Sequence, residues 1–240
     1  MTSGATGRQA RGTLRPLRPA FLTLATVLLL THPGIAHDPP RTTVTWAGDI
    51  ARLVGARCTR CHAPDGKGPM SLVTYEDARP WASAMREEVL ARRMPKWHAA
   101  RGYGEFSNDP TLSPFDIALI VAWVDGGAVR GDLSKAAQPL PARPSPAAPP
   151  NSRTATLACG DRPLPAGKLL GIRPRLAEHA SAAFTVVFPD GRQEIVAWIR
   201  DYEAEFAETY WLDTPIELGR GSRLRVEGEP GCSVELLVSR

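Results

Sequence analysis

Three residues with chemically useful side chains stand close together near position 60. Cys58 and Cys61 are separated by two residues, and His62 follows the second cysteine directly. Two thiols at this spacing with an adjacent imidazole are the attachment pattern of a c-type haem, in which the thiols form thioethers with the porphyrin and the imidazole binds the iron. We therefore expect one covalent haem c, held by Cys58, Cys61 and His62, with His62 as the proximal ligand.

Two other sites are built from paired cysteines, and the surrounding sequence favours neither. A zinc site would need a second cysteine or histidine pair at similar spacing, and the sequence contains none. A redox-active dithiol of the thioredoxin type would follow a buried strand, but the residues before Cys58 have a helical pattern. Apolar side chains recur there at helical spacing, at Trp46, Ile50, Leu53 and Val54.

The first 36 residues have the composition of a secretory signal peptide. Four arginines (8, 11, 15 and 18) precede the apolar run 20–30, and Gly34-Ile35-Ala36 offers small residues for cleavage. The apolar run is shorter than the roughly 20 residues that span a bilayer. We expect cleavage after Ala36 and a periplasmic or other extracytoplasmic location in a Gram-negative-like bacterium, with an uncleaved anchor as the alternative.

The net positive charge of the chain comes from this leader. The 240 residues include 29 basic and 25 acidic side chains, and removal of the four leader arginines leaves 25 of each. Nucleic-acid binding draws on clustered excess positive charge, so no nucleic-acid partner is expected. No stable membrane span is expected after cleavage.

Helix signals dominate residues 37–130. Thr74 with Asp77 resembles a capping box, and Pro80 interrupts the run that follows, whose helical propensity continues to Arg93. Ser113 is a good N-cap, and Gly126-Gly127 ends the last helix. The apolar residues expected to be buried are Trp81, Met85 and Val89, then Ile117, Ile120, Val121 and Val124. The pattern predicts a small all-α cytochrome c domain over 37–130, with the haem replacing much of its core.

The sixth iron ligand has two candidates. Met94 lies 32 residues beyond the proximal histidine and directly before Pro95, so its thioether could cover the distal face. His98 is the alternative ligand, and an open sixth position is the third possibility. Met70 and Met85 are expected to serve in packing. The spacing favours Met94.

Several cations bracket Met94. Arg92, Arg93, Lys96 and Arg101 suit a solvated helix end, where positive charge complements the helix dipole. They would equally form a positive collar around the haem edge, which neutralises the propionates or steers an acidic redox partner protein. Both interpretations stay open at this point.

The composition changes after residue 130. Residues 131–152 carry six prolines interleaved with alanine and predict a stiff linker. Residues 153–240 alternate with strand period, and Pro189-Asp190-Gly191 predicts a hairpin between two apolar runs. We expect a small antiparallel β-sandwich. Cys159 and Cys232 are the two remaining cysteines, and in an oxidising compartment they should form a disulfide that joins the first strand to the last.

The chain also resembles a bacterial group of class I-like cytochrome c proteins that are often fused to a module similar to the C-terminal half of ascorbate-dependent copper monooxygenases. The haem-domain resemblance rests on residues 72–81, 93–99 and 120–128, and the resemblance to the copper module on 188–192, 200–202, 209–215 and 218–222. It implies haem attachment at the cysteine pair. The copper module of that family needs a closely spaced histidine pair and a methionine, but here His179 stands alone and no methionine follows Met94. No copper is expected.

These observations favour a periplasmic monohaem c-type cytochrome that transfers electrons, with an accessory β module that docks a partner. Two other functions would each need a further feature. A haem-linked oxidoreductase of the monooxygenase kind would require copper ligands, and Asp201, Glu203 and Glu205 are expected to be solvated turn acids without a paired base. A haem-based redox or gas sensor would require an open or labile sixth position.

Overall fold

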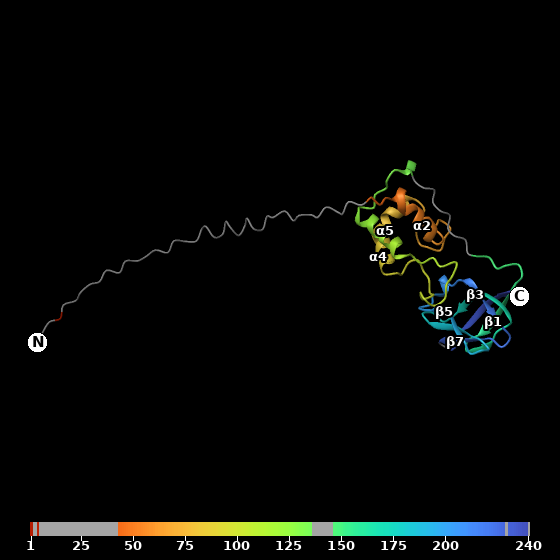
Figure 1. Ribbon diagram of the computed structural model, residues 1–240. Helices are drawn as coiled ribbons and strands as arrows, with labels where there is room; N and C mark the ends of the chain where they lie inside the picture. The colour runs from red at the N-terminus through yellow and green to blue at the C-terminus, as the bar shows by residue number, and fades with distance from the viewer. Residues whose placement is uncertain (2–3, 5–42, 136–145, 229, 240) are drawn as a thin grey trace. The chain divides into compact units, whose positions relative to one another are not determined.

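The computed structural model describes Met1, Gly4 and residues 43–135, 146–228 and 230–239 (Figure 1). The signal peptide expected at 1–36 and the middle of the expected linker therefore lie outside the described residues. From residue 43 onward the described residues belong to one compact unit, Pro39–Arg240. The domain boundaries expected at 130 and 153 stay a prediction.

Short helical elements make up the first described part of the chain. In order they are η1 (Trp46–Ile50), α2 (Ala51–Arg57), α3 (Tyr75–Ala78), η2 (Arg79–Trp81), α4 (Ala82–Leu90), α5 (Pro114–Asp125) and η3 (Leu133–Lys135). Two of their starts were expected from local chemistry. Thr74 and Asp77 form a complete capping box for α3, and Ser113 and Asp116 form another for α5. Gly126 caps the end of α5, as expected.

The buried faces of these helices agree in part with the expected pattern. Trp46, Ile50 and Val54 lie in one core cluster, and Met85, Val89 and Ile120 join them there. Trp81 is 43% exposed, so its expected burial is wrong. The helix expected to run to Arg93 ends at Leu90, because Arg92 takes a left-handed backbone conformation (φ 55°) that interrupts the helix.

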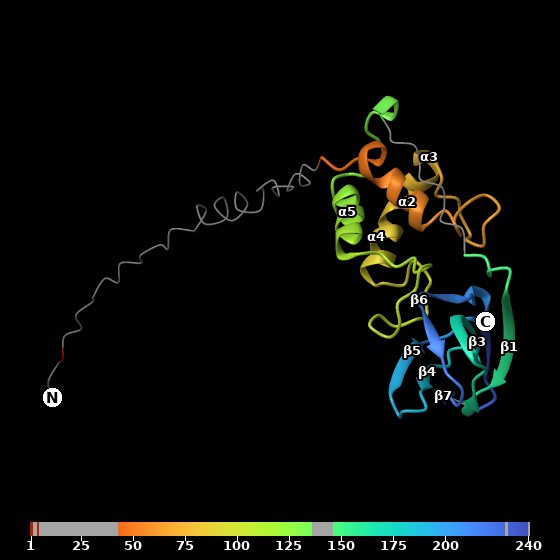
Figure 2. The ribbon, with the colours of Figure 1, turned by 45° about the vertical axis from the view of Figure 1, so that its right-hand side comes forward.

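Two antiparallel sheets of four strands follow (Figure 2). One has the strand order β1-β8-β3-β6 and the other β2-β7-β4-β5. The strands are β1 (Ser152–Ala158), β2 (Asp161–Pro163), β3 (Gly167–Arg175), β4 (Ala182–Val187), β5 (Gln193–Ile199), β6 (Tyr210–Leu218), β7 (Arg223–Gly228) and β8 (Ser233–Ser239), with the short helix η4 (Ala204–Phe206) between β5 and β6. The expected hairpin across Pro189-Asp190-Gly191 is confirmed, since β4 and β5 pair directly.

A single apolar core is shared by both sheets. Alternate residues of β4 and β8 are buried, which is the pattern of strands with one face on a core. Phe184 from one sheet and Leu236 from the other belong to the same cluster and are fully buried. We call these eight strands and their core the β module.

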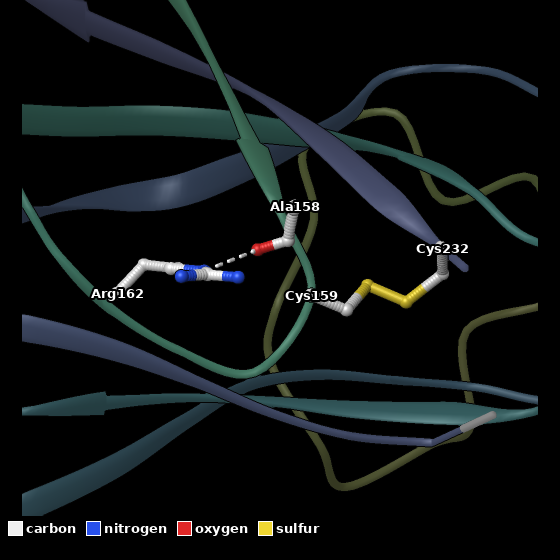
Figure 3. Close-up of a disulfide and its surroundings, with 4 residues drawn as sticks. All are labelled: Ala158, Cys159, Arg162 and Cys232. Carbon is white, nitrogen blue, oxygen red and sulfur yellow. Dashed lines mark hydrogen bonds between the residues drawn. A yellow bond between two sulfur atoms is a disulfide. The ribbon is translucent and has the colours of Figure 1, made fainter. Parts of the chain in front are cut away.

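The disulfide expected between Cys159 and Cys232 is confirmed (Figure 3). Cys159 directly follows β1 and Cys232 directly precedes β8, and these strands pair along their whole length. The first and last strands are therefore joined both by a hydrogen-bond ladder and by a covalent bond. Arg162 donates to the Ala158 carbonyl at 3.3 Å beside this bond.

Residues 97–108 connect the helical elements to the β module, and we call them the crossing segment. Ala99 forms a β-bridge with Ile199 of β5, and Phe106 forms one with Leu212 of β6. These two strands are the outer strands of different sheets. Trp97, Ala99 and Phe106 pack with the β core rather than with the helical one. The chain thus returns to helix only at α5.

The expected fold class, a small all-α cytochrome c domain followed by a β-sandwich, is therefore wrong. The described residues form two four-stranded antiparallel sheets and short helices, the longest of which has 12 residues. Prolines at 64, 69, 80, 95 and 110 keep the helices of this region short. In addition, the crossing segment contributes its side chains to the β core. Within the described residues, no helix is long and apolar enough to cross a membrane.

Candidate haem-attachment site

The turn at Cys58–His62 is formed by hydrogen bonds to a single carbonyl. α2 ends at Arg57, and the N–H groups of Cys61 and His62 both donate to the Cys58 carbonyl, at 3.1 and 2.9 Å. This tight turn holds the two cysteines and the histidine within one coil of backbone. Thr59 reinforces it, because its hydroxyl donates to the Gly55 carbonyl at 2.8 Å.

The ring of His62 is held by the loop that follows it. Its Nδ1 lies 3.1 Å from the Met70 carbonyl oxygen, which can only accept, so Nδ1 carries the proton. The other ring nitrogen, Nε2, is then the one with a free lone pair. Gly68 lies directly against this ring, and a side chain there would collide with it. Histidines that bind metals characteristically donate a hydrogen bond from the N–H of their other ring nitrogen in this way.

The two thiols in this turn are free. Neither Cys58 nor Cys61 is in a disulfide, and both are partly buried. Burial, followed by the proximity of Cys61, raises the pKa of the Cys58 thiol to about 12, and Arg57 opposes this shift. Cys58 and Met70 both pack against the helical core cluster. Apolar surroundings, two free thiols and an oriented imidazole are the groups that would hold a haem c, so the residues present fit it.

Comparison with known proteins assigns no family. No protein-family model and no curated protein matches the sequence. Among solved structures, a pentameric capsid protein isolated from metagenomic phage sequences is 14% identical over 38% of this chain and 62% of its own, with a TM-score of 0.26. A second structure of a pentameric capsid protein from the same type of source is 18% identical over 65% of this chain and 89% of its own, also with a TM-score of 0.26. Scores this low carry no argument about fold or function.

Met94 lies four residues after the end of α4, beside a cavity of about 320 Å³. Val89 and Leu112 line the same cavity and belong to the helical core that also contacts Cys58. Met94 is partly buried, and the thioether of a partly buried methionine is available as an iron ligand. Met94 stays the predicted sixth ligand.

His98, the alternative ligand, packs against the β module and is only 6% exposed. The Glu203 N–H donates to its Nε2 at 3.3 Å, so the ring proton is on Nδ1, which lies 3.3 Å from the Tyr210 hydroxyl. Burial lowers the pKa of His98 below its ordinary value, an effect that the nearby Glu203 opposes. Both ring nitrogens therefore have protein partners, and neither is free for a metal in this arrangement.

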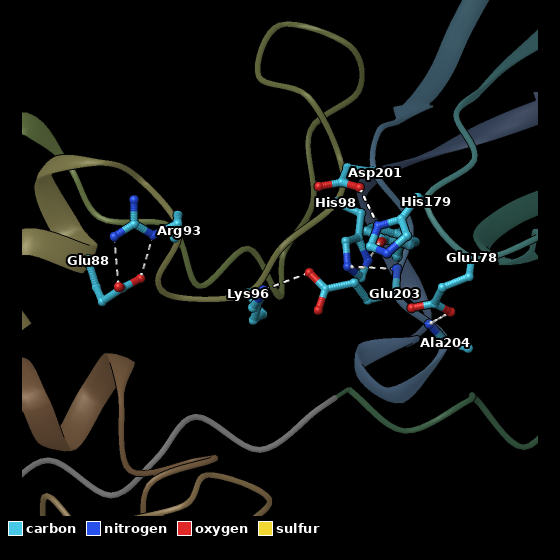
Figure 4. Close-up of polar contacts among 10 residues, drawn as sticks. Glu88, Arg93, Lys96, His98, Glu178, His179, Asp201, Glu203 and Ala204 are labelled. Atoms are coloured by element: carbon cyan, nitrogen blue, oxygen red, sulfur yellow. Dashed lines mark hydrogen bonds and ion pairs between the residues drawn. The ribbon is translucent and has the colours of Figure 1, made fainter.

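Among the acids between β5 and β6, Asp201 and Glu205 are exposed as expected, but Glu203 is not a solvated turn acid. Glu203 forms an ion pair with Lys96 at 2.6 Å, and both side chains are about three-quarters buried (Figure 4). Glu208 forms an ion pair with Arg60, which lies inside the Cys58–His62 turn, at 2.7 Å. Lys67 donates to the Glu205 carbonyl at 2.8 Å. One short acidic stretch thus contacts the segment around the haem motif and the segment after Met94.

The remaining cations near Met94 have separate partners. Arg93 forms ion pairs with Glu87 and Glu88 at 3.2 and 2.8 Å, as expected for an exposed helix end. Arg101 donates to the Leu112 carbonyl at 2.6 Å. The cations that were considered as a collar are therefore divided between local pairs and contacts to the β module. The sequence could not reveal this division, because Lys96 and its partner Glu203 lie 107 residues apart.

His179, the histidine expected in a surface loop, is exposed and lies 2.8 Å from Asp201 (Figure 4). Both residues have a left-handed backbone, with φ of 62° and 47°. The hydrogen bond to Asp201, followed by the carboxylate charge, raises the pKa of His179. Among the residues that the structure describes, no group of three or more histidines, cysteines and carboxylates could hold a metal ion.

Proposed function

We propose that this chain is an exported monohaem c-type cytochrome that transfers electrons to or from a partner protein. The geometry of the Cys58–His62 turn carries the proposal. Two free thiols flank a single turn, and the adjacent imidazole donates Nδ1–H to the Met70 carbonyl and keeps Nε2 available. A bound haem would supply a one-electron couple there, and the protein's part is to attach, orient and partly bury it.

The predicted ligand set supports a carrier rather than a sensor. With His62 and Met94 in the axial positions, no position would remain open for a gas or a substrate. Thioether ligation also raises the haem potential. A redox partner protein, an extracytoplasmic location and the role of the β module in docking belong to the same proposal.

Covalent haem is tested by maturing the full chain in a host that ligates haem c in its periplasm. The pigment should stay with the polypeptide during acid-acetone extraction, with about one iron per chain, since Cys58 and Cys61 supply two thioethers to one porphyrin. Cys58→Ser should leave one thioether and shift the pyridine haemochrome band. Cys159→Ser is the matched control, because that cysteine lies outside the motif and should leave the band unchanged. Colourless protein, or pigment that extracts completely, would contradict the proposal.

Electron transfer is distinguished from sensing by the reaction of the reduced protein with carbon monoxide. A carrier with both axial positions filled should bind the gas slowly and incompletely, and it should be reduced and reoxidised by small redox mediators without loss of pigment. Rapid, stoichiometric carbon monoxide binding by the native protein would reject the carrier in favour of a sensor.

A further inference from the structure

The two candidate iron ligands, Met94 and His98, both follow α4. Met94 and His98, four residues later, line the same cavity, and the His98 ring is also hydrogen-bonded to Tyr210 of the β module. Four residues of extended chain span at most about 14 Å. The position of Met94 is therefore limited on its N-terminal side by the end of α4 and on its C-terminal side by the contacts that hold His98.

The side chain of His98 is held at both ring nitrogens. Nε2 accepts from the Glu203 N–H and Nδ1 donates to the Tyr210 hydroxyl, each at 3.3 Å. The Tyr210 ring also packs against Trp97 at a tilt of 59°, with centroids 4.7 Å apart. Removal of either polar partner would leave a buried imidazole nitrogen unsatisfied, which is costly.

The backbone around His98 is also hydrogen-bonded to the β module. The Arg200 N–H donates to the His98 carbonyl at 2.9 Å, and the Ala100 N–H donates to the Trp198 carbonyl at 2.8 Å. These bonds flank the isolated β-bridge between Ala99 and Ile199 of β5. Lys96 adds its ion pair with Glu203. All of these contacts come from the β module, and all act within six residues of Met94.

We infer that His98 is a positioning residue, through which the β module fixes the segment that presents Met94 to the haem iron. The inference rests on the proposed function and deepens it, because it gives the β module a role in ligation. In this arrangement His98 does not contact the iron. Loosening its attachment makes the Met94 thioether easier to displace while the thioether bonds at Cys58 and Cys61 stay intact.

Tyr210→Phe tests this inference with the least disturbance. The change removes the hydroxyl that contacts His98 and keeps the ring that packs on Trp97. Tyr202→Phe is the matched control, since its hydroxyl is also buried in the β module but donates to the Pro174 carbonyl at 3.2 Å. The readouts on the haem-loaded full chain are the weak ferric charge-transfer band of thioether ligation and the affinity for added imidazole, which competes with Met94.

We expect Tyr210→Phe to bind imidazole about tenfold more tightly than the unaltered protein and to lose part of the thioether band, because a buried donor is left unpaired. Tyr202→Phe should stay within about twofold, since it leaves the bonds to His98 intact. His98→Gln should partly restore the unaltered behaviour relative to His98→Ala, because its amide can still accept from the Glu203 N–H.

The possible failures are distinguishable from one another. If the pigment is attached but both tyrosine variants bind imidazole alike, the inference is wrong and the proposed function stands. If Met94→Ala keeps its ferric spectrum and His98→Ala loses its sixth ligand, His98 is itself the ligand and the inference is overturned. If no covalent haem forms, the proposed function fails first, as the extraction experiment would already have shown.

Discussion

Asn108 offers a direct test of how the crossing segment is attached. It is 5% exposed, and its amide nitrogen donates to the Thr209 carbonyl at 2.8 Å and to Glu208 Oε2 at 3.3 Å. Its Oδ1 accepts from the Trp211 N–H at 3.0 Å. Asn108→Asp keeps the shape and the acceptor for Trp211 but replaces the two donor hydrogens with an oxygen. That oxygen would face a carbonyl and a carboxylate.

The magnitude follows from the bonds that are lost. A buried polar group without its partner costs about 1–3 kcal/mol, and two donated bonds disappear. A buried negative charge beside Glu208 adds desolvation and repulsion. We expect the free energy of unfolding at neutral pH to fall by about 3 kcal/mol, measured by urea denaturation of the haem-loaded chain with far-ultraviolet circular dichroism.

The stability of the Asn108→Asp variant should decrease as the pH rises. Burial and the Glu208 charge would raise the pKa of the new carboxyl group in the folded state above its unfolded value. The folded state then binds the extra proton more tightly, so stability is highest below the unfolded pKa. It declines as the pH rises towards the folded pKa and is constant above it.

Asn151→Asp is the control, because Asn151 is exposed and the chemical change is identical. It should alter stability by less than about 0.5 kcal/mol at any pH, as surface substitutions usually do. If Asn108→Asp behaves in the same way, the buried hydrogen bonds of Asn108 do not attach the crossing segment, and the argument from its geometry fails.

Three further predictions concern single features of the fold. The double variant Cys159→Ser, Cys232→Ser should lose about 4 kcal/mol of unfolding free energy, because the bond closes a separation of 73 residues; a loss below about 1 kcal/mol in urea denaturation would refute this. Ser113→Ala removes the N-cap of α5 and should lower the unfolding free energy by about 1 kcal/mol, whereas Ser113→Asp, which keeps a capping oxygen, should recover most of it. The pKa of His179, followed by nuclear magnetic resonance, should lie above that of free histidine and fall towards it in Asp201→Asn. Because the folded pKa is the higher one, the associated stability is fully present below the unfolded pKa and disappears as the pH rises through the folded pKa, and an unchanged pKa in the variant would contradict the assignment.

The features predicted correctly from sequence have local causes. The capping boxes at Thr74 and Ser113 need residues three apart, and the β4–β5 hairpin needs only its own turn. The disulfide was found because two cysteines remained once the haem motif had taken the others. In each case the interacting groups are neighbours in sequence or are limited in number.

The crossing segment was missed because its signal is not local. Gly102 and Gly104 interrupt any strand period and suggest a loop, and the partners of this segment lie about one hundred residues later. Asn108 is bonded to residues at 208, 209 and 211 without any sequence pattern that joins them. The contact between His98 and Tyr210 was missed for the same reason, because no local pattern joins the two residues. The choice between Met94 and His98 as the ligand could therefore not be settled from their spacing.

The position of the crossing segment has a consequence for any attempt to produce the strands separately. A fragment cut at the proline-rich stretch would begin after residues 97–108 and would leave the outer edges of β5 and β6 without the backbone that now meets them. Open edges of this kind are templates for aggregation between molecules. Soluble fragments should therefore start before Trp97, even though this places the cut inside the stretch of chain that contains the short helices.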